Sequence, residues 1–176
     1  TQDALMYLDA DMIVHQPMGE SEFSTQSGTG MTLVRHPGYF RPGVLRRAAL
    51  YLSSPKLALG DFYSTLKVGG IGAWDTNPES KAFVPKELRN QYFCGGTWWG
   101  YHDDFLALVE ELDSRVTQDE LAGVMAKWHD ESHINWWGAN HAHQTKGPSY
   151  CYSVSYKWLS GLPMIIQAVD KDEATR

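Results

Sequence analysis

The chain is poor in cysteine, in basic charge and in long apolar runs, and each shortage excludes a class of protein. Cys94 and Cys151 are the only cysteines. Two distant cysteines cannot form a disulfide framework, and their spacing matches no zinc motif. The spacing does not suggest a single disulfide either, and there is no Asn-x-Ser/Thr sequon. Both observations favour a reducing compartment. Because no apolar run is long enough to cross a membrane, we expect no membrane span.

Basic residues are outnumbered by acidic ones. The chain has 15 Lys and Arg against 21 Asp and Glu, which gives a formal net charge of −6. No basic stripe is visible, so neither a nucleic acid nor an anionic membrane surface is expected as the main partner. The length of 176 residues and the apolar fraction of 43% suit one globular domain over residues 1–176 with a substantial core.

Aromatic residues, by contrast, are abundant, with seven Trp and nine Tyr. Most such side chains supply core area, although they also stack on the apolar faces of sugar rings. Periodicity predicts strands mixed with helices, and therefore an α/β fold with a mixed sheet flanked by helices. Strands are expected at residues 4–8, 12–14, 31–34, 82–84 and 92–100, with extended chain at 150–156. Helices are expected at 44–53, at 103–116, after a capping box at 117–120 and at 134–141, whereas residues 57–72 read as irregular.

The apolar strand expected at residues 4–8 has the pattern of a buried central strand. With almost nothing before it, we expect the chain to be an N-terminally truncated fragment. Asp9 and Asp11 follow this strand. Side chains two residues apart in an extended chain share one side, so the two carboxylates can converge on one hard cation such as Mg²⁺ or Mn²⁺. α/β proteins bind ligands beyond strand ends, which strengthens the metal-site hypothesis.

Residues 128–133 read Trp-His-Asp-Glu-Ser-His and place two carboxylates and two imidazoles within five residues. Neighbouring carboxylates repel each other when ionised, so each needs solvent, a partner or a ligand. One interpretation is a solvated helix start with Asp130 as its N-cap. The other is a functional site, in which Ser132 and His133 have only structural roles.

Two further segments carry candidate ligand-binding residues. In the aromatic, glycine-rich segment at residues 92–100, Trp98 and Trp99 offer stacking faces for a sugar, although a tightly packed core strand explains the same residues. His36 lies in a Pro-Gly turn, where most histidines are simply exposed. An acidic pair, an aromatic wall and a carboxylate cluster together indicate chemistry on a sugar phosphate.

Four segments carry a family resemblance. They are Leu8-Asp9-Ala10-Asp11-Met12, His36-Pro37-Gly38-Tyr39, Tyr92-Phe93-Cys94-Gly95-Gly96 and Trp128-His129-Asp130-Glu131-Ser132-His133-Ile134-Asn135, in this order. The chain resembles glycosyltransferase family 6, the family of the ABO blood-group transferases and α-1,3-galactosyltransferase. The tryptophan-led acidic segment is the most specific of the four. The resemblance extends over nearly the whole chain, except that residues 44–72 match poorly and are longer than expected.

The resemblance implies a GT-A-like fold and a retaining hexosyltransferase. Such an enzyme moves galactose or N-acetylgalactosamine from a UDP-sugar to a glycan acceptor in α-1,3 linkage. It implies that Asp9 and Asp11 bind Mn²⁺, with Mg²⁺ as the alternative. Glu131 matches the catalytic glutamate, which either attacks the anomeric carbon or stabilises an oxocarbenium-like state. The implied donor-binding residues are Asp9, Asp11, Cys94, Gly95, Gly96, His129, Asp130, Lys171 and Arg176, and the implied acceptor-binding residues are His36 and Trp128.

Donor choice and source follow from the same resemblance. Gly96 leaves room for an N-acetyl group, which favours N-acetylgalactosamine over galactose. The family's uridine-binding half precedes the acidic pair, and here it is largely missing. The absence of a sequon and of a disulfide framework favours a bacterial or viral relative in the cytoplasm, whereas a vertebrate source would place the protein in the Golgi lumen.

Two other functional classes stay open. A carbohydrate-binding or degenerate, non-catalytic glycosyltransferase-like module would use the same aromatic wall, but a plain lectin would not bind UDP with Mn²⁺. A metal-dependent hydrolase would bind Zn²⁺ tightly without a nucleotide. Its ligands would be His129, His133, His141 and His143, although these histidines form no open three-ligand motif such as His-Glu-x-x-His.

Overall fold

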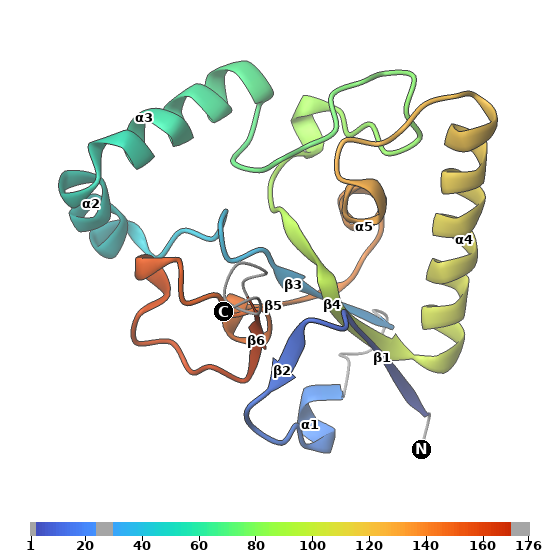
Figure 1. Ribbon diagram of the computed structural model, residues 1–176, viewed down its shortest axis with the longest axis horizontal. Helices are drawn as coiled ribbons and strands as arrows, with labels where there is room; N and C mark the ends of the chain where they lie inside the picture. Colours follow the sequence, from blue (N-terminus) through green and yellow to red (C-terminus); the bar gives the residue numbers. More distant parts are fainter. Residues whose placement is uncertain (1–2, 24–29, 170–176) are drawn as a thin grey trace.

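The computed structural model describes residues 3–23 and 30–169, and a mixed four-stranded sheet lies at its centre (Figure 1). The sheet contains, in spatial order, β1 (Ala4–Leu8), β4 (Phe93–Tyr101), β3 (Met31–Arg35) and β5 (Gln144–Lys146). β4 is antiparallel to both β1 and β3, whereas β5 is parallel to β3. A smaller antiparallel pair joins β2 (Met12–Val14) to β6 (Ile166–Ala168). The predicted α/β class with a mixed sheet is confirmed.

β4 is the strand around which the core is built. Eight of its nine residues are buried, as expected for an apolar strand that is covered on both faces. One core cluster contains Met31, Leu33, Phe93, Trp98, Leu108, Ile134 and Trp137, and a second contains Val34, Cys94, Trp99, Tyr150, Cys151 and Ile166. Trp98 and Trp99 are 6% and 0% exposed, so both serve the core and neither offers the open stacking face predicted for a sugar.

The pairing of β4 with β3 is interrupted in the middle of the strand. Leu33 pairs with Trp98 and Arg35 with Phe93, so two steps along β3 correspond to five steps along β4. The irregular stretch contains Gly95 and Gly96. Irregularities of this kind bend a strand and redirect its neighbours, and they are common beside functional sites.

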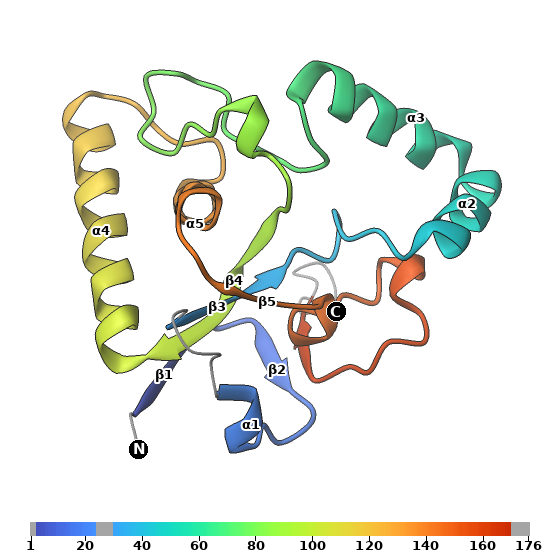
Figure 2. The same cartoon turned by 180° about the vertical axis from the view of Figure 1, so that it is seen from behind.

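Two helices cover one face of the sheet: α4 (His102–Leu121) and α5 (His129–Asn140) (Figures 1 and 2). The remaining short elements are α1 (Glu20–Phe23) and the 3₁₀ turns η2 (Lys86–Leu88), η3 (Pro148–Tyr150) and η4 (Lys157–Leu159). No helix in the described ranges is long and apolar enough to cross a membrane.

A pair of helices, α2 (Val44–Ser53) and α3 (Pro55–Tyr63), continues into the π-helical turn η1 (Ser64–Val68). We call residues 44–68 the α2–α3 arm. It lies on the opposite side of the molecule from α4 (Figures 1 and 2). Many of its large apolar side chains are exposed, including Leu45 at 87% and Phe62 at 64%. The arm ends at Gly69, whose φ of +84° is the left-handed conformation that glycine adopts without strain.

A buried ion pair fixes the arm to the rest of the protein. Arg41 and Asp61 have side chains only 7% and 9% exposed, and Arg41 Nη2 donates to Asp61 Oδ1 over 2.7 Å. Arg41 Nη1 also donates to the carbonyl oxygens of Gly38 and Phe40, both at 2.8 Å. Buried charges need such partners because they have lost their hydration. The pair therefore links α3 to the turn that carries His36.

Several predicted elements are wrong in type or position. Within the described residues β1 is an edge strand, since its only partner in the sheet is β4. Residues 117–120 start no helix, because α4 continues to Leu121 and Asp119 accepts hydrogen bonds from Ser80 and the Lys81 backbone. Tertiary partners thus outcompete the capping-box pattern.

The other errors concern the segments around the arm and the end of the chain. Residues 57–68 are helical, since Pro55 occupies the first turn of α3, where proline is tolerated. Residues 82–84 form no strand, although Val84 is buried against Trp74 and Tyr92. Residues 150–156 contain only the end of η3 and one isolated bridge at Tyr152. Burial without strand pairing accounts for the apolar pattern at residues 82–84, whereas Val154 in the second segment is 50% exposed.

Cys94 and Cys151 are joined by a disulfide that the sequence reading did not favour. The two residues are 57 positions apart, but both lie in the cluster formed by Trp99, Tyr150 and their neighbours. Contact across the core cannot be read from sequence spacing. With Cys94 and Cys151 paired, the two cysteines do not favour a reducing compartment.

Candidate active site

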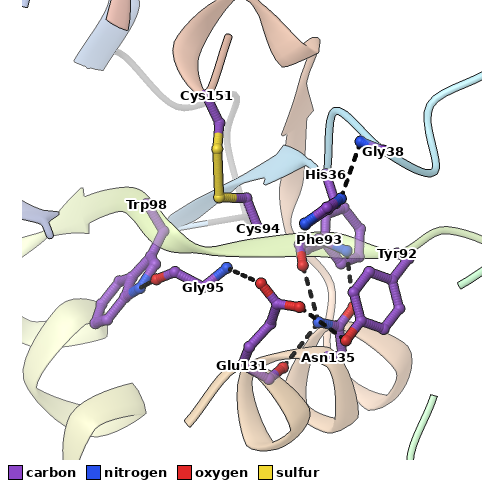
Figure 3. The surroundings of a disulfide bond; sticks show 10 residues. All are labelled: His36, Gly38, Tyr92, Phe93, Cys94, Gly95, Trp98, Glu131, Asn135 and Cys151. Atoms are coloured by element: carbon purple, nitrogen blue, oxygen red, sulfur yellow. Dashed lines mark hydrogen bonds between the residues drawn. A yellow bond between two sulfur atoms is a disulfide. The ribbon is translucent and has the colours of Figure 1, made fainter. Parts of the chain in front are cut away.

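The carboxylate of Glu131 lies beside β4 and is held by two hydrogen bonds (Figure 3). Tyr92 donates its hydroxyl to Oε1 over 2.9 Å, and the backbone N–H of Gly95 donates to Oε2 over 3.0 Å. Burial raises the pKa of Glu131, while these two hydrogen bonds oppose that rise. The carboxylate is thus oriented at both oxygens and partly desolvated, which is typical of a catalytic carboxylate.

Asn135 fixes the helix that carries Glu131. It lies one turn further along α5, so the two side chains share a face of the helix. Its Oδ1 accepts from the Phe93 N–H at 2.7 Å, and its Nδ2 donates to the carbonyls of Phe93 and Glu131 at 2.9 and 2.8 Å. The amide therefore sets the register of α5 against β4. The sequence motifs predicted no role for Asn135 or Tyr92. Both residues nevertheless lie in segments that resemble the family, residues 128–135 and 92–96.

Gly95 allows the close approach of α5 to β4. A Cβ atom at this position would lie 2.9 Å from Cβ of Glu131, which is shorter than any normal carbon contact. A glycine is therefore required here for Glu131 to reach the Gly95 N–H.

Asp9 and Asp11 follow β1, and Asp9 lies against the neighbouring glycine of β4. The Asp9 N–H donates to the Gly96 carbonyl over 3.0 Å, and Tyr7 donates its hydroxyl to Asp9 Oδ1 over 2.8 Å. The pKa of Tyr7 is raised to about 12, first by burial and then by Asp9, with smaller contributions from Asp130 and Asp11. These carboxylates therefore gather around Tyr7, a residue that the sequence reading missed.

Gly96 does not leave open space for a sugar substituent. A Cβ atom there would collide with Met12 Cε and lie 2.7 Å from Asp9 Oδ2. The glycine instead allows β4 to approach Asp9 and Met12 closely. The physical argument that favoured N-acetylgalactosamine over galactose therefore has no support at this position.

The start of α5 presents three predicted ligand-binding residues to solvent. Trp128 is 51% exposed, and His129 and Asp130 are also exposed. His129 has a φ of +47°, a left-handed conformation that is rare for a residue with a side chain and is common at functional sites. Asp130 and Glu131 both occupy the first turn of the helix, where the helix dipole favours negative charge.

Ser132 and His133 are buried, as their predicted structural roles require. The Trp128 N–H donates to Ser132 Oγ over 3.0 Å, which holds the entry to α5. His133 Nε2 lies 3.6 Å from Asp119 Oδ2. No group of three or more His, Cys, Asp or Glu suited to a metal is present in the part of the chain that the structure describes. The histidine-based hydrolase therefore gains no support.

A cavity of about 360 Å³ lies beside β4. Its lining includes Tyr7, Gly95, Trp98 and Asp130, together with Asp113 and apolar side chains of α4. Tyr7 also donates a hydrogen bond to Asp9, and the Gly95 N–H donates one to Glu131. A mainly apolar lining with a few polar groups is typical of sites for small ligands.

His36 packs against Tyr92, the residue that donates its hydroxyl to Glu131. Its Nδ1 accepts a hydrogen bond from the Gly38 N–H over 3.0 Å, so the neutral ring carries its proton on Nε2. Burial lowers the pKa of His36 to about 4, which keeps the ring neutral near pH 7. The ring packs against Tyr39 and Tyr92, with centroids 4.8 and 5.8 Å away. His36 is thus positioned to offer an N–H donor within an aromatic group.

The remaining predicted residues are not brought together with Glu131. The side chain of Cys94 lies on the opposite side of β4, where it is bonded to Cys151 (Figure 3). Lys171 and Arg176 lie outside the described residues. The structure therefore assembles Asp9, Gly95, Gly96 and Glu131 around one stretch of β4, with Asp130 beside them.

Comparison with known proteins identifies the family. Residues 62–175 match the family model described as glycosyltransferase family 6, which is well over half of the chain. The chain belongs to glycosyltransferase family 6. The matching region includes the β4 segment and Glu131, and the mixed sheet with its flanking helices is consistent with a GT-A-like fold.

The curated relatives are distant and considerably longer. The chain is 26% identical to histo-blood group ABO system transferase 1 of Rattus norvegicus over 168 residues, which is 94% of this chain and 38% of the rat protein. Transferase 2 of the same system and species is 25% identical over 168 residues, covering 94% and 40% of the two chains. Globoside alpha-1,3-N-acetylgalactosaminyltransferase 1 of Gallus gallus is 24% identical over 156 residues, covering 89% and 35%. The chain thus spans about two fifths of the length of these relatives.

Proposed function

We propose that this protein is a retaining hexosyltransferase that moves galactose or N-acetylgalactosamine from a UDP-sugar to a glycan acceptor in α-1,3 linkage. The observation that carries the proposal is the placement of Glu131. Its carboxylate is held by Tyr92 and Gly95, one residue along β4 from the glycine that contacts Asp9. The names of the curated relatives, one of which is an alpha-1,3-N-acetylgalactosaminyltransferase, support the same class of reaction.

Asp9 and Asp11 form the proposed site for Mn²⁺, or for Mg²⁺. Their hard carboxylate oxygens suit either cation, and only two protein carboxylates would leave coordination positions for diphosphate oxygens and water. When bound, the cation would act as a Lewis acid that neutralises the diphosphate and improves the leaving group. Lys171 and Arg176 are proposed to contact the same diphosphate.

Glu131 is the proposed group at the anomeric carbon. Its two hydrogen bonds fix the direction of both oxygens before a substrate binds, so little reorganisation is needed during the reaction. The carboxylate acts either as a nucleophile or as a countercharge to an oxocarbenium-like state. His129 and Asp130 are proposed to hold the donor sugar, with His36 and Trp128 on the acceptor side.

The experiment that tests this proposal measures the metal and nucleotide steps separately from transfer. Calorimetry with UDP, with and without Mn²⁺, should show binding that needs the metal and is lost in Asp9→Asn and Asp11→Asn. NMR of the product formed from each donor should show retention of the α configuration. Sugar binding without any metal-dependent UDP binding would instead identify a non-catalytic carbohydrate-binding module, and the proposal would be wrong.

A further inference from the structure

A second cavity, of about 480 Å³, lies between the α2–α3 arm and the segment just before β4. Its lining residues come from the arm and the loop after it, from the turn that carries His36, and from residues 89–92. Tyr92 lines this cavity and also donates its hydroxyl to Glu131. The cavity therefore adjoins the proposed reaction centre directly.

All charged side chains that line the cavity are basic. They are Arg35, Arg41, Arg47 and Arg89, and no Asp or Glu is among the described lining residues. The whole chain carries a net charge of −6, so the positive charge around this cavity is opposite in sign to that of the chain. Like charges around one cavity repel each other unless an anion is present.

Two of the four arginines are held by several contacts within the fold, whereas the other two make at most one side-chain hydrogen bond to a described residue. Arg41 is paired with Asp61, and Arg89 is buried and donates to the carbonyls of Val84 and Val68. Arg35 uses its Nε–H to reach Gln91 Oε1 over 3.2 Å. Arg47 makes no side-chain hydrogen bond to any residue that the structure describes. Among the residues that the structure describes, Arg35 and Arg47 thus have donors without a partner.

The position of the cavity separates it from the proposed diphosphate site. Asp9 lies against Gly96, whereas the cavity is lined by Tyr92, which directly precedes β4. Neither Asp9 nor Gly96 is among its described lining residues. Tyr39, another lining residue, packs against His36 with ring centroids 4.8 Å apart. The cavity is therefore on the His36 side of Glu131.

We propose that this cavity binds an anionic group of the acceptor saccharide, a sugar carboxylate or a sugar phosphate, between Arg35 and Arg47. The planar guanidinium fork matches either anion with two parallel hydrogen bonds. Tyr39 and Tyr92 supply aromatic surface for the sugar ring. The assignment of the ligand as the acceptor rests on the proposed function, whereas the anion site itself rests on the cavity and its arginines.

The test compares two acidic sugars with a neutral one, with the full protein and without donor or metal. Titration calorimetry or NMR would measure the affinity for methyl glucuronide, glucose 6-phosphate and the neutral methyl glucoside. We expect at least one acidic sugar to bind about tenfold more tightly than the neutral one, because hydrogen bonds to charged groups are about twice as strong as neutral ones. The acidic sugar that binds more tightly than methyl glucoside identifies the anion as a carboxylate or a phosphate. Equal affinity for all three would overturn the proposal.

Matched variants assign the effect to the two arginines. Arg47→Gln, Arg35→Gln and their combination should remove the preference for acidic sugars, and Arg47→Lys should retain part of it. Arg46→Gln is the control, since Arg46 is the exposed neighbour in α2 and does not line the cavity. An equal loss in Arg46→Gln would show only a general charge effect, and the proposal would fail. Wild-type protein alone gives the sugar comparison, so a misfolded variant does not prevent the test.

This experiment is independent of the transferase proposal. If acidic sugars bind through Arg35 and Arg47 but UDP does not bind with Mn²⁺, the anion site stands and the proposed function fails. If UDP binds and transfer occurs but acidic and neutral sugars bind equally, the proposed function stands and the anion site fails.

Discussion

The wall formed by β4 and α5 and the α2–α3 arm are built in opposite ways. In the wall, nearly every residue of β4 is buried, and Glu131 and Asn135 are each held by two or more hydrogen bonds to the strand or its flanking residues. In the arm, large apolar side chains such as Leu45 and Phe62 are mainly exposed. A single buried ion pair, Arg41 with Asp61, connects α3 to the His36 turn.

This difference in packing matches two different requirements, support of a catalytic carboxylate and variation of a binding surface. A carboxylate at a reaction centre must be held to within a fraction of an ångström, which needs a rigid, densely packed support. A surface that selects among acceptors can change its sequence at little cost in stability if few core contacts depend on it. The four predictions below test this comparison.

The largest effect is expected from Glu131→Gln. This change keeps the size of the side chain but removes its charge, so transfer should fall by at least about 10²–10³-fold, as when a stabilising electrostatic group is lost. UDP binding in the presence of Mn²⁺ should be unchanged in calorimetry. Glu120→Gln, an exposed glutamate near the end of α4, is the matched control. Retained turnover in Glu131→Gln would contradict the assignment of this residue.

A smaller but still large effect is expected from Gly95→Ala. The new Cβ would lie 2.9 Å from Cβ of Glu131, so the carboxylate must shift, and kcat should fall about 10- to 100-fold. Gly60→Ala in the arm is the control, because nothing lies within 4 Å of its Cβ position. It should leave kcat unchanged and stabilise α3 by about 0.5–1 kcal/mol. Equal effects on kcat would show that the wall is not the more rigid region.

Tyr92→Phe should have a moderate effect that depends on pH. The Tyr92 hydroxyl favours the charged form of Glu131, so its loss should raise the pKa of Glu131 further. If the ionised carboxylate is the active form, the acidic limb of the kcat profile moves to higher pH, with a loss of about tenfold on that limb. The control is Tyr63→Phe, since Tyr63 is 61% exposed in the arm. A limb that moves to lower pH would refute the role of this hydrogen bond.

The smallest effect is expected in the exposed face of the arm. Leu59 is 68% exposed, so Leu59→Ala should change the free energy of unfolding by less than about 0.5 kcal/mol. Leu108 is 1% exposed on the buried face of α4, and Leu108→Ala should cost about 2–5 kcal/mol because it leaves a cavity. Urea denaturation would measure both. A large loss in Leu59→Ala would mean that this face is covered in the folded protein.

The predicted site residues Glu131, Asp9, Gly95 and Gly96 lie together in the structure, and their functional roles stay predictions. They could be proposed from sequence because their motifs are local. Tyr7 and Tyr92 were not predicted as site residues. Their roles depend on the carboxylates next to their hydroxyl groups, Asp9 and Glu131, and the sequence does not show these contacts. The edge position of β1, the helix at residues 55–63 and the Cys94–Cys151 disulfide were missed for the same reason. Strand order and core contacts depend on residues that are far apart in the chain.

The acidic pair, the glycines of β4 and the carboxylate cluster of α5 follow from the sequence alone, because short-range spacing sets which side chains share a face. The single domain over residues 1–176, the bound metal and the cytoplasmic location stay predictions. Only the tertiary structure placed Glu131 against Gly95 and Asp9 against Gly96, within the irregular stretch of one strand. Only the tertiary structure gathered Arg35 and Arg47 around one cavity. Packing brings such distant residues together because it maximises the burial of apolar surface, which no local pattern encodes.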